Sequence, residues 1–192
     1  MRDLEELMEV RMRQMTGVAA AGILVVMAVG LQAQARGSAA QPMSDAIRSS
    51  WDGAKGNIAS SAADVPDNVY AFKPVDTVRT FGEVVSHVAG ANYVFCAAAR
   101  GEKSPHAENA FDSLATKAAI VKAFAESVAY CDVAYKALTD RTAAEIIDMP
   151  FGMGKAARAA ALMNNSGHLN EHYGNLVTYM RMKGIVPPSS RR

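Results

Sequence analysis

The sequence predicts an all-α protein, a bundle of four helices, and three observations support this prediction. Four long segments place apolar residues at spacings of three and four, which is the repeat of one helix face. No run alternates apolar and polar residues for long enough to predict a sheet. Proline, glycine and polar residues separate the four segments, so each apolar face can pack on the others.

The first two predicted helices lie on either side of a loop that contains two prolines. The first helix runs over about 44–62, with Ser44 or Asp45 as its N-terminal cap. The second begins near Thr80, because Thr80 and Glu83 have the spacing of a capping box. The apolar stripes consist of Ile47, Trp51, Ala54, Ile58 and Ala62 in the first helix and Phe81, Val84, Val85, Val88 and Phe95 in the second.

The third predicted helix covers about 115–138, and the fourth covers about 155–183. The polar connection "RGEKSPHAENAFDS" precedes the third helix, and "PFGMGK" marks the break before the fourth. The fourth helix stops at Gly184, with two prolines beyond it. Gly167 lies inside this helix, where glycine costs about 1 kcal/mol relative to alanine. It therefore predicts a kink or a close packing contact.

Residues 1–35 are predicted to be a signal peptide and not part of the bundle. The apolar centre, Gly17–Leu31, is closer to the roughly 7–15 residues of a secretory core than to the roughly 20 of a spanning helix. Arg11 and Arg13 precede it, and "AQA" at 33–35 fits a signal-peptidase site.

Two alternatives remain open for this N-terminal segment. Residues 17–33 would serve as a membrane anchor if the segment stays uncleaved. Translation from Met12 would remove the acidic opening and leave a short basic start. With cleavage, 36–42 is a linker, 43–190 is the bundle domain, and the protein is exported to a periplasmic or extracellular location. We expect membrane contact only if the segment is uncleaved.

Length, charge and cysteine content limit the possible classes of protein. A chain of 192 residues with a net charge of +1 fits one domain and lacks the basic character of a nucleic-acid binder. Cys96 and Cys131 are the only cysteines. In an oxidising compartment they can pair, or they are small buried apolar residues on two helices.

The four histidines contain the strongest chemical signal in the sequence. His168 and His172 are four residues apart on one predicted helix, so their imidazoles lie one above the other. Two ligands from one helix rarely hold a catalytic metal, and a third must come from elsewhere. His87 is the natural candidate, because it lies beside the apolar stripe of the second helix. His106 is weaker, because it belongs to a polar loop.

Three neutral histidines would leave a divalent ion with its full charge and an open coordination position. Such a site activates water or accepts an anionic sulfur or oxygen, and imidazole ligands suit Zn, Ni or Fe. Asn164 and Glu83 each precede a histidine by four residues and are candidates to orient it, although Glu83 also has the capping role. The alternative is that the histidines are polar residues lining a cavity.

The segments "VYAFKPVDTVRTFGEVVSHVAGANYVFCAAARGE" and "HLNEHYGNLVTYMRMKGIVPPSS" resemble the DinB-like superfamily, the damage-inducible DinB and YfiT-like proteins. The resemblance covers about 43–190. It implies an up-up-down-down four-helix bundle and a homodimer. It also implies a metal site formed by one histidine of the second helix and two of the fourth, which match His87, His168 and His172.

The resemblance further implies a metal-dependent enzyme of the hydrolase or thiol-dependent transferase type, with an unknown small-molecule substrate. Export would separate this protein from cytosolic thiol cofactors, which argues against thiol transfer. The alternative function is a non-catalytic exported protein that binds a metal or ligand, or a dimeric interaction protein.

Overall fold

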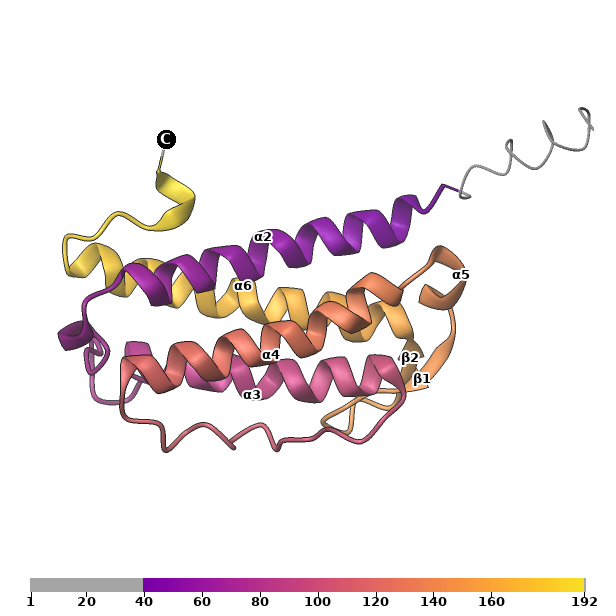
Figure 1. The fold of residues 1–192 in the computed structure, drawn as a ribbon, viewed down its shortest axis with the longest axis horizontal. Helices are drawn as coiled ribbons and strands as arrows, with labels where there is room; N and C mark the ends of the chain where they lie inside the picture. The colour runs from indigo at the N-terminus through magenta and orange to yellow at the C-terminus, as the bar shows by residue number, and fades with distance from the viewer. Residues whose placement is uncertain (1–39, 192) are drawn as a thin grey trace, which may run out of the picture. The chain divides into compact units, whose positions relative to one another are not determined.

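The computed structural model describes residues 40–191, and its elements confirm the four-helix bundle. The long helices are α2 (Pro42–Asp64), α3 (Phe81–Arg100), α4 (Lys117–Ala137) and α6 (Arg158–Met182) (Figure 1). The connections contain η1 (Asp67–Val69), α5 (Asp140–Ala143), β1 (Ile146–Asp148), β2 (Lys155–Ala157) and η2 (Pro188–Ser190). The signal peptide predicted over residues 1–35 lies outside the described residues.

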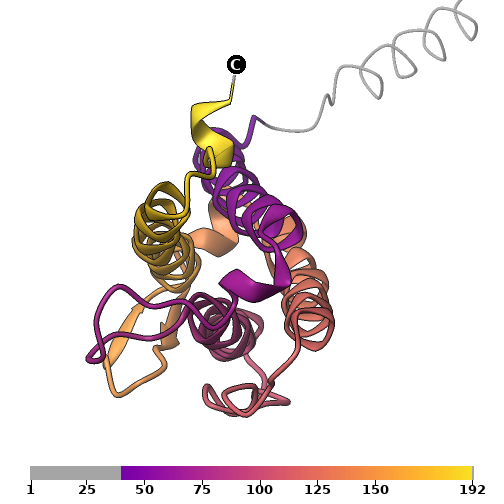
Figure 2. The ribbon, with the colours of Figure 1, turned by 90° about the vertical axis from the view of Figure 1, so that its left-hand side faces the viewer.

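Each long helix packs on two neighbours around a shared core. Seen end-on, α2 and α3 stand diagonally opposite each other, with α4 and α6 between them (Figure 2). The neighbours α3 and α4 run in the same direction, and so do α2 and α6 (Figure 1). The other two neighbouring pairs, α2 with α4 and α3 with α6, are antiparallel (Figure 1).

The order of helix directions is therefore up-down-down-up, and the expected up-up-down-down order is wrong. Residues 65–80 fold at one end of the bundle, where the Tyr70 hydroxyl donates to Ala62 O at 2.6 Å and Gly82 N donates to Tyr70 O at 2.9 Å. As a result, α3 starts at the end where α2 stops. Residues 101–116 instead travel back along the bundle, so α4 starts beside the start of α3 (Figure 1).

A β-hairpin precedes α6, and the sequence did not predict it. Lys155–Ala157, expected as the start of the fourth helix, forms β2 and pairs antiparallel with β1. Between the strands, Phe151, Gly152 and Gly154 adopt left-handed backbone angles, with φ of 56°, 71° and 77°. Strands of three residues are too short to give a recognisable alternation. The helix therefore begins at Arg158.

The N-terminus of α2 is capped by a distant residue. The helix begins at Pro42, and neither Ser44 nor Asp45 acts as its N-terminal cap. Instead, the Asp140 carboxylate of α5 accepts hydrogen bonds from Ser44 N at 2.8 Å and Met43 N at 3.3 Å. These backbone groups have no partner within the first turn of a helix, so a side chain from another element can supply one.

The predicted apolar stripes of α2 and α3 are buried in the core. Two aromatic rings connect three helices there. Trp51 of α2 stacks on Tyr135 of α4 with ring centroids 4.5 Å apart, and the Tyr135 hydroxyl donates to Leu162 O of α6 at 2.8 Å. The indole nitrogen of Trp51 donates to Asp132 at 2.8 Å, so the buried ring keeps its hydrogen bond.

A disulfide joins α3 to α4 in the interior. Cys96 and Cys131 are bonded, with their Cα atoms 5.3 Å apart, which decides between the two alternatives left open by the sequence. The Asn165 amide nitrogen of α6 lies 3.7 Å from each sulfur. Gly167, by contrast, has open space around it, since a Cβ there would meet no atom within 4 Å. Of the two alternatives predicted for Gly167, a kink or a close packing contact, the close contact is therefore wrong.

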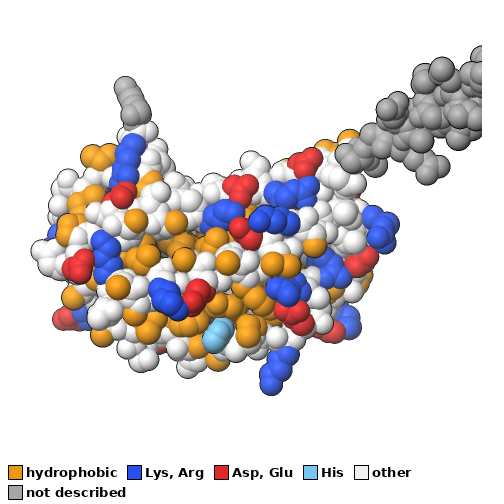
Figure 3. All heavy atoms as spheres, in the orientation of Figure 1, with side chains coloured by type: hydrophobic (Ala, Val, Ile, Leu, Met, Phe, Trp, Pro, Cys, Tyr) orange, Lys and Arg blue, Asp and Glu red, His pale blue; other side chains and the backbone are white. Residues whose placement is uncertain are grey.

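The bundle surface carries mixed charge. Figure 3 shows basic and acidic side chains interspersed over one face, around a central band of hydrophobic side chains. Within residues 40–191, none of the helices combines the length and the hydropathy needed to cross a bilayer.

Candidate metal centre

The packing of α3 on α6 brings three of the four histidines together. His87 lies in the first half of α3, and His168 and His172 lie one turn apart in α6. His87 and His172 are each only 8% exposed, and His168 is half-buried. Because α3 and α6 are antiparallel neighbours, the face of α3 that carries His87 meets the face of α6 that carries His168 and His172.

The imidazoles converge through their Nε2 atoms. His168 Nε2 lies 3.1 Å from His87 Nε2 and 3.0 Å from His172 Nε2. One nitrogen of each ring can be chosen so that all three lie within 4.8 Å of one another. Ligands at about 2.0–2.1 Å from a tetrahedral ion are about 3.3 Å apart, so the two spacings to His168 fit a metal to within a few tenths of an ångström.

The surroundings keep the imidazoles neutral. Burial, the neighbouring imidazoles and the positive charge of Arg79 lower the pKa of His168 to about 3. Burial, His87 and Arg79 lower the pKa of His172 to about 4, against a partial opposing effect of Glu171. Burial also lowers the pKa of His87. Near pH 7 the three rings therefore have lone pairs free for a cation.

Glu108, in the connection between α3 and α4, lies behind His87. Its carboxylate Oε1 is 3.6 Å from His87 Nδ1, the nitrogen that points away from the cluster. The backbone of this connection passes directly over Gly90, where a Cβ would lie 1.7 Å from Glu108 O. Only glycine leaves room for that approach, so Gly90 lets the connection bring a carboxylate to the back of a candidate ligand.

The other two rings differ in their outer contacts. Asn175, one turn beyond His172, places its carboxamide nitrogen 3.4 Å from His172 Nδ1. His168 Nδ1 is buried and has no hydrogen-bond partner among the described residues. An unsatisfied buried polar atom costs about 1–3 kcal/mol, so this position carries a stability cost that an apolar residue would avoid.

Three other predicted candidates lie outside the cluster or have another role. His106 stays in its loop, with its ring 4.6 Å from the Tyr93 ring by centroid. Asn164 is exposed and makes no hydrogen bond to His168. Glu83 forms the predicted capping box: its carboxylate accepts from Thr80 N at 2.7 Å, and its own N–H donates to the Thr80 hydroxyl at 3.2 Å.

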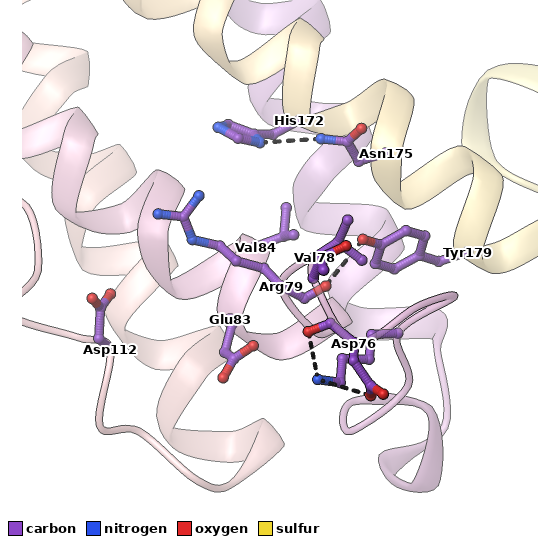
Figure 4. A pocket seen from close by; sticks show the side chains of 11 residues that line it. Asp76, Val78, Arg79, Glu83, Val84, Asp112, His172, Asn175 and Tyr179 are labelled. Carbon is purple, nitrogen blue, oxygen red and sulfur yellow. Dashed lines mark hydrogen bonds and ion pairs between the residues drawn. The ribbon is translucent and has the colours of Figure 1, made fainter.

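A cleft of about 710 Å³ opens beside the cluster, and we call it the Arg79 cleft (Figure 4). His172 forms part of its wall, so a molecule in the cleft would be adjacent to the histidines. The wall is mainly polar and contains both basic and acidic side chains. The lining residues are Lys73, Asp76, Thr77, Val78, Arg79, Glu83, Val84, Asp112, His172, Asn175 and Tyr179.

Arg79, Glu108 and Asn175 were not predicted from the sequence as residues of the site. Asn175 had a usable signal, because residues three apart on a helix are neighbours. Arg79 and Glu108 lie in connections, and no periodicity relates a connection to a helix face. Their positions depend on how residues 65–80 and 101–116 fold back on the bundle.

Comparison with known proteins agrees with this fold. Residues 51–176 match the model of a family described as the DinB superfamily. A DinB-like protein of Bacillus cereus has a TM-score of 0.64 at 20% identity, over 75% of this chain and 95% of that chain. A DinB-like protein of Bacillus subtilis has a TM-score of 0.59 at 22% identity, over 76% of this chain and 98% of that chain.

A mutant of a mycothiol-dependent maleylpyruvate isomerase is also similar, with a TM-score of 0.58 at 17% identity. That similarity covers 69% of this chain but 60% of the isomerase. At these identities the likeness concerns the fold. Among curated proteins, none matches this chain.

Proposed function

Because the chain belongs to the DinB superfamily and gathers three histidines, we propose that it binds a divalent metal ion through His87, His168 and His172. We further propose that it is a metal-dependent enzyme of the hydrolase or thiol-dependent transferase type. Its substrate is a small molecule bound in the Arg79 cleft.

The convergence of the three Nε2 atoms is the observation that supports this proposal. Spacings of 3.0 and 3.1 Å between ring nitrogens are close to those of ligands around one ion. Burying three imidazoles is unfavourable for an apo protein, since each loses hydration and His168 Nδ1 gains no partner. A cation bound to the three Nε2 atoms would compensate the lost hydration of those nitrogens.

The residues around the cluster prepare the imidazoles for a metal. Glu108 favours the His87 tautomer that carries its proton on Nδ1 and leaves Nε2 free. Asn175 favours the corresponding tautomer of His172 when its carboxamide is rotated by 180°, because the amide oxygen then accepts a hydrogen bond from Nδ1–H. A divalent ion held by three neutral ligands would supply Lewis-acid chemistry and an open coordination position.

A non-catalytic metal- or ligand-binding protein is the second candidate, and one observation favours it. The charged groups of the Arg79 cleft are partly committed to structural roles. Lys73 pairs with Asp76 at 3.4 Å, and Glu83 caps α3. These contacts leave fewer groups for proton transfer during a reaction.

Metal analysis of protein purified without a histidine tag tests the site. We expect about one ion per chain in the wild type, and a loss of at least tenfold in His168→Ala, because two ligands rarely hold such an ion. His106→Ala is the matched control, since its ring lies outside the cluster, and should keep the wild-type content. Circular dichroism checks that each variant is folded.

Equal metal in the wild type and His168→Ala, or none in either, would remove the basis of the site. If metal is present, assays for thiol transfer and for ester and amide hydrolysis separate enzyme from binder. Turnover that disappears in His168→Ala but persists in His106→Ala supports the enzyme. Metal binding without turnover of any substrate class supports the second candidate.

A further inference from the structure

Arg79 is held by its backbone at the edge of the proposed metal site. It immediately precedes the N-cap of α3, and the Tyr179 hydroxyl of α6 donates to Arg79 O at 3.0 Å. The Tyr179 ring packs edge-on against Phe72, with centroids 5.9 Å apart. Two elements therefore fix the point from which the Arg79 side chain extends. Figure 4 shows this side chain directed toward the His172 end of the cleft.

The guanidinium of Arg79 has no carboxylate partner within the part of the chain that the structure describes. The ion pairs of residues 40–191 do not include it, although Asp76, Glu83 and Asp112 line the same cleft. Lys73, the other cation in the wall, is paired with Asp76 and donates to its backbone oxygen at 3.0 Å. Arg79 is thus the one uncommitted cation among the described residues of the cleft.

The guanidinium of Arg79 has no ion-pair partner among residues 40–191 and can accept a bound anion as one. Arg79 lines the same cleft as His172, and Figure 4 shows its side chain extending toward the His172 end of that cleft. A divalent ion on the three histidines would add positive charge beside it. A cleft with an unpaired guanidinium next to a cation attracts and holds an anion, because both charges favour it.

We propose that Arg79 determines specificity by binding the carboxylate of a small anionic substrate while another group of the substrate reaches the histidine cluster. This inference rests on the proposed metal site and adds the substrate class to it. The guanidinium presents parallel N–H donors that match the two oxygens of a carboxylate. Because Arg79 acts on the substrate, its loss should change selectivity and leave the metal in place.

The charges of the cleft favour a carboxylate over a phosphate. Phosphate carries more negative charge, and the acidic side chains of Glu83 and Asp112 face the same space. Arg79 is the one uncommitted cationic side chain among the described residues of the cleft wall, and it pairs with a single carboxylate. A planar monoanion also uses the fork of one guanidinium fully.

The experiment uses Co(II)-loaded protein and two probes that differ only at one end. The first probe, succinic monohydroxamate, carries a free carboxylate. In the second probe an uncharged primary amide replaces that carboxylate. The hydroxamate group of each probe binds the metal. The visible Co(II) spectrum reports binding. We expect the wild type to prefer the carboxylate about tenfold, which corresponds to about 1.4 kcal/mol. Arg79→Gln should reduce this ratio to about one with unchanged cobalt content, and Arg79→Lys should give an intermediate ratio.

Arg141→Gln on α5 is the matched control, because it makes the same change of charge outside the cleft and should keep the wild-type ratio. A ratio near one in the wild type, or an undiminished ratio in Arg79→Gln, overturns the assignment while the metal site stands. Inorganic phosphate that displaces the probe better than acetate overturns the choice of carboxylate. Failure of the wild type to hold cobalt removes both the site and this inference.

Discussion

Breaking the Cys96–Cys131 disulfide should cost the protein about 4 kcal/mol of unfolding free energy. The bond closes a loop of 35 residues between α3 and α4. For that length, the loss of chain entropy in the unfolded state is about 13 cal/mol/K, or about 3.8 kcal/mol at 25 °C. A domain of this size changes its Tm by about 2–4 °C per kcal/mol, so reduction should lower the Tm by roughly 8–15 °C.

The assay is thermal unfolding followed by circular dichroism, with and without a thiol-free reductant. Thiol titration of the denatured protein should find no free thiols before reduction and two after it. Cys96→Ala/Cys131→Ala is the control, because its Tm should not respond to the reductant and should fall near that of the reduced wild type. A wild-type Tm that moves by less than about 2 °C on reduction would refute the reasoning.

Two further perturbations test packing and charge. Gly90→Ala should destabilise the protein by about 1–3 kcal/mol in urea unfolding, because its Cβ would collide with Glu108 O. Gly53→Ala, in open space on α2, should instead stabilise by about 0.5–1 kcal/mol; a loss of stability in both variants would contradict the packing argument. Burial raises the pKa of Asp132, but hydrogen bonds from Lys55 and Trp51 outweigh it and lower that pKa overall. The stabilisation from Asp132 is therefore present above the unfolded pKa of about 4 and is lost as the pH falls through the folded value. The gap in unfolding free energy between wild type and Asp132→Asn should stay constant above about pH 5 and close below about pH 4; a gap independent of pH would contradict this.

The sequence was sufficient for features that depend on local repeats. The stripe from Ile47 to Ala62 predicted a buried helix face, because residues three and four apart share one side of a helix. The capping box of Thr80 and Glu83 was also predictable, since both partners lie within one turn. The four-residue spacing of His168 and His172 likewise predicted that they share one helix face. His87 was predictable as the third ligand because it lies beside the apolar stripe of another helix.

Features that depend on chain direction were not predictable from the repeats. Periodicity shows which side of a helix is buried, but it does not show whether two neighbours run parallel or antiparallel. Asp140 caps α2 from a remote part of the chain, and only the tertiary fold brings it there. Arg79 and Glu108 were missed for the same reason, because they lie in connections whose paths are set by those directions.

The parallel pair of α3 and α4 gives the connection over residues 101–116 a second use. Between antiparallel helices a short turn is enough, commonly about 2–8 residues. Here the chain must return along the whole bundle, and on the way it covers the outer side of α3 (Figure 1). A stretch that the topology requires for connection alone thereby becomes an outer wall of the histidine cluster. Substitutions in this one surface segment can therefore change the wall without altering the helices that carry the histidines.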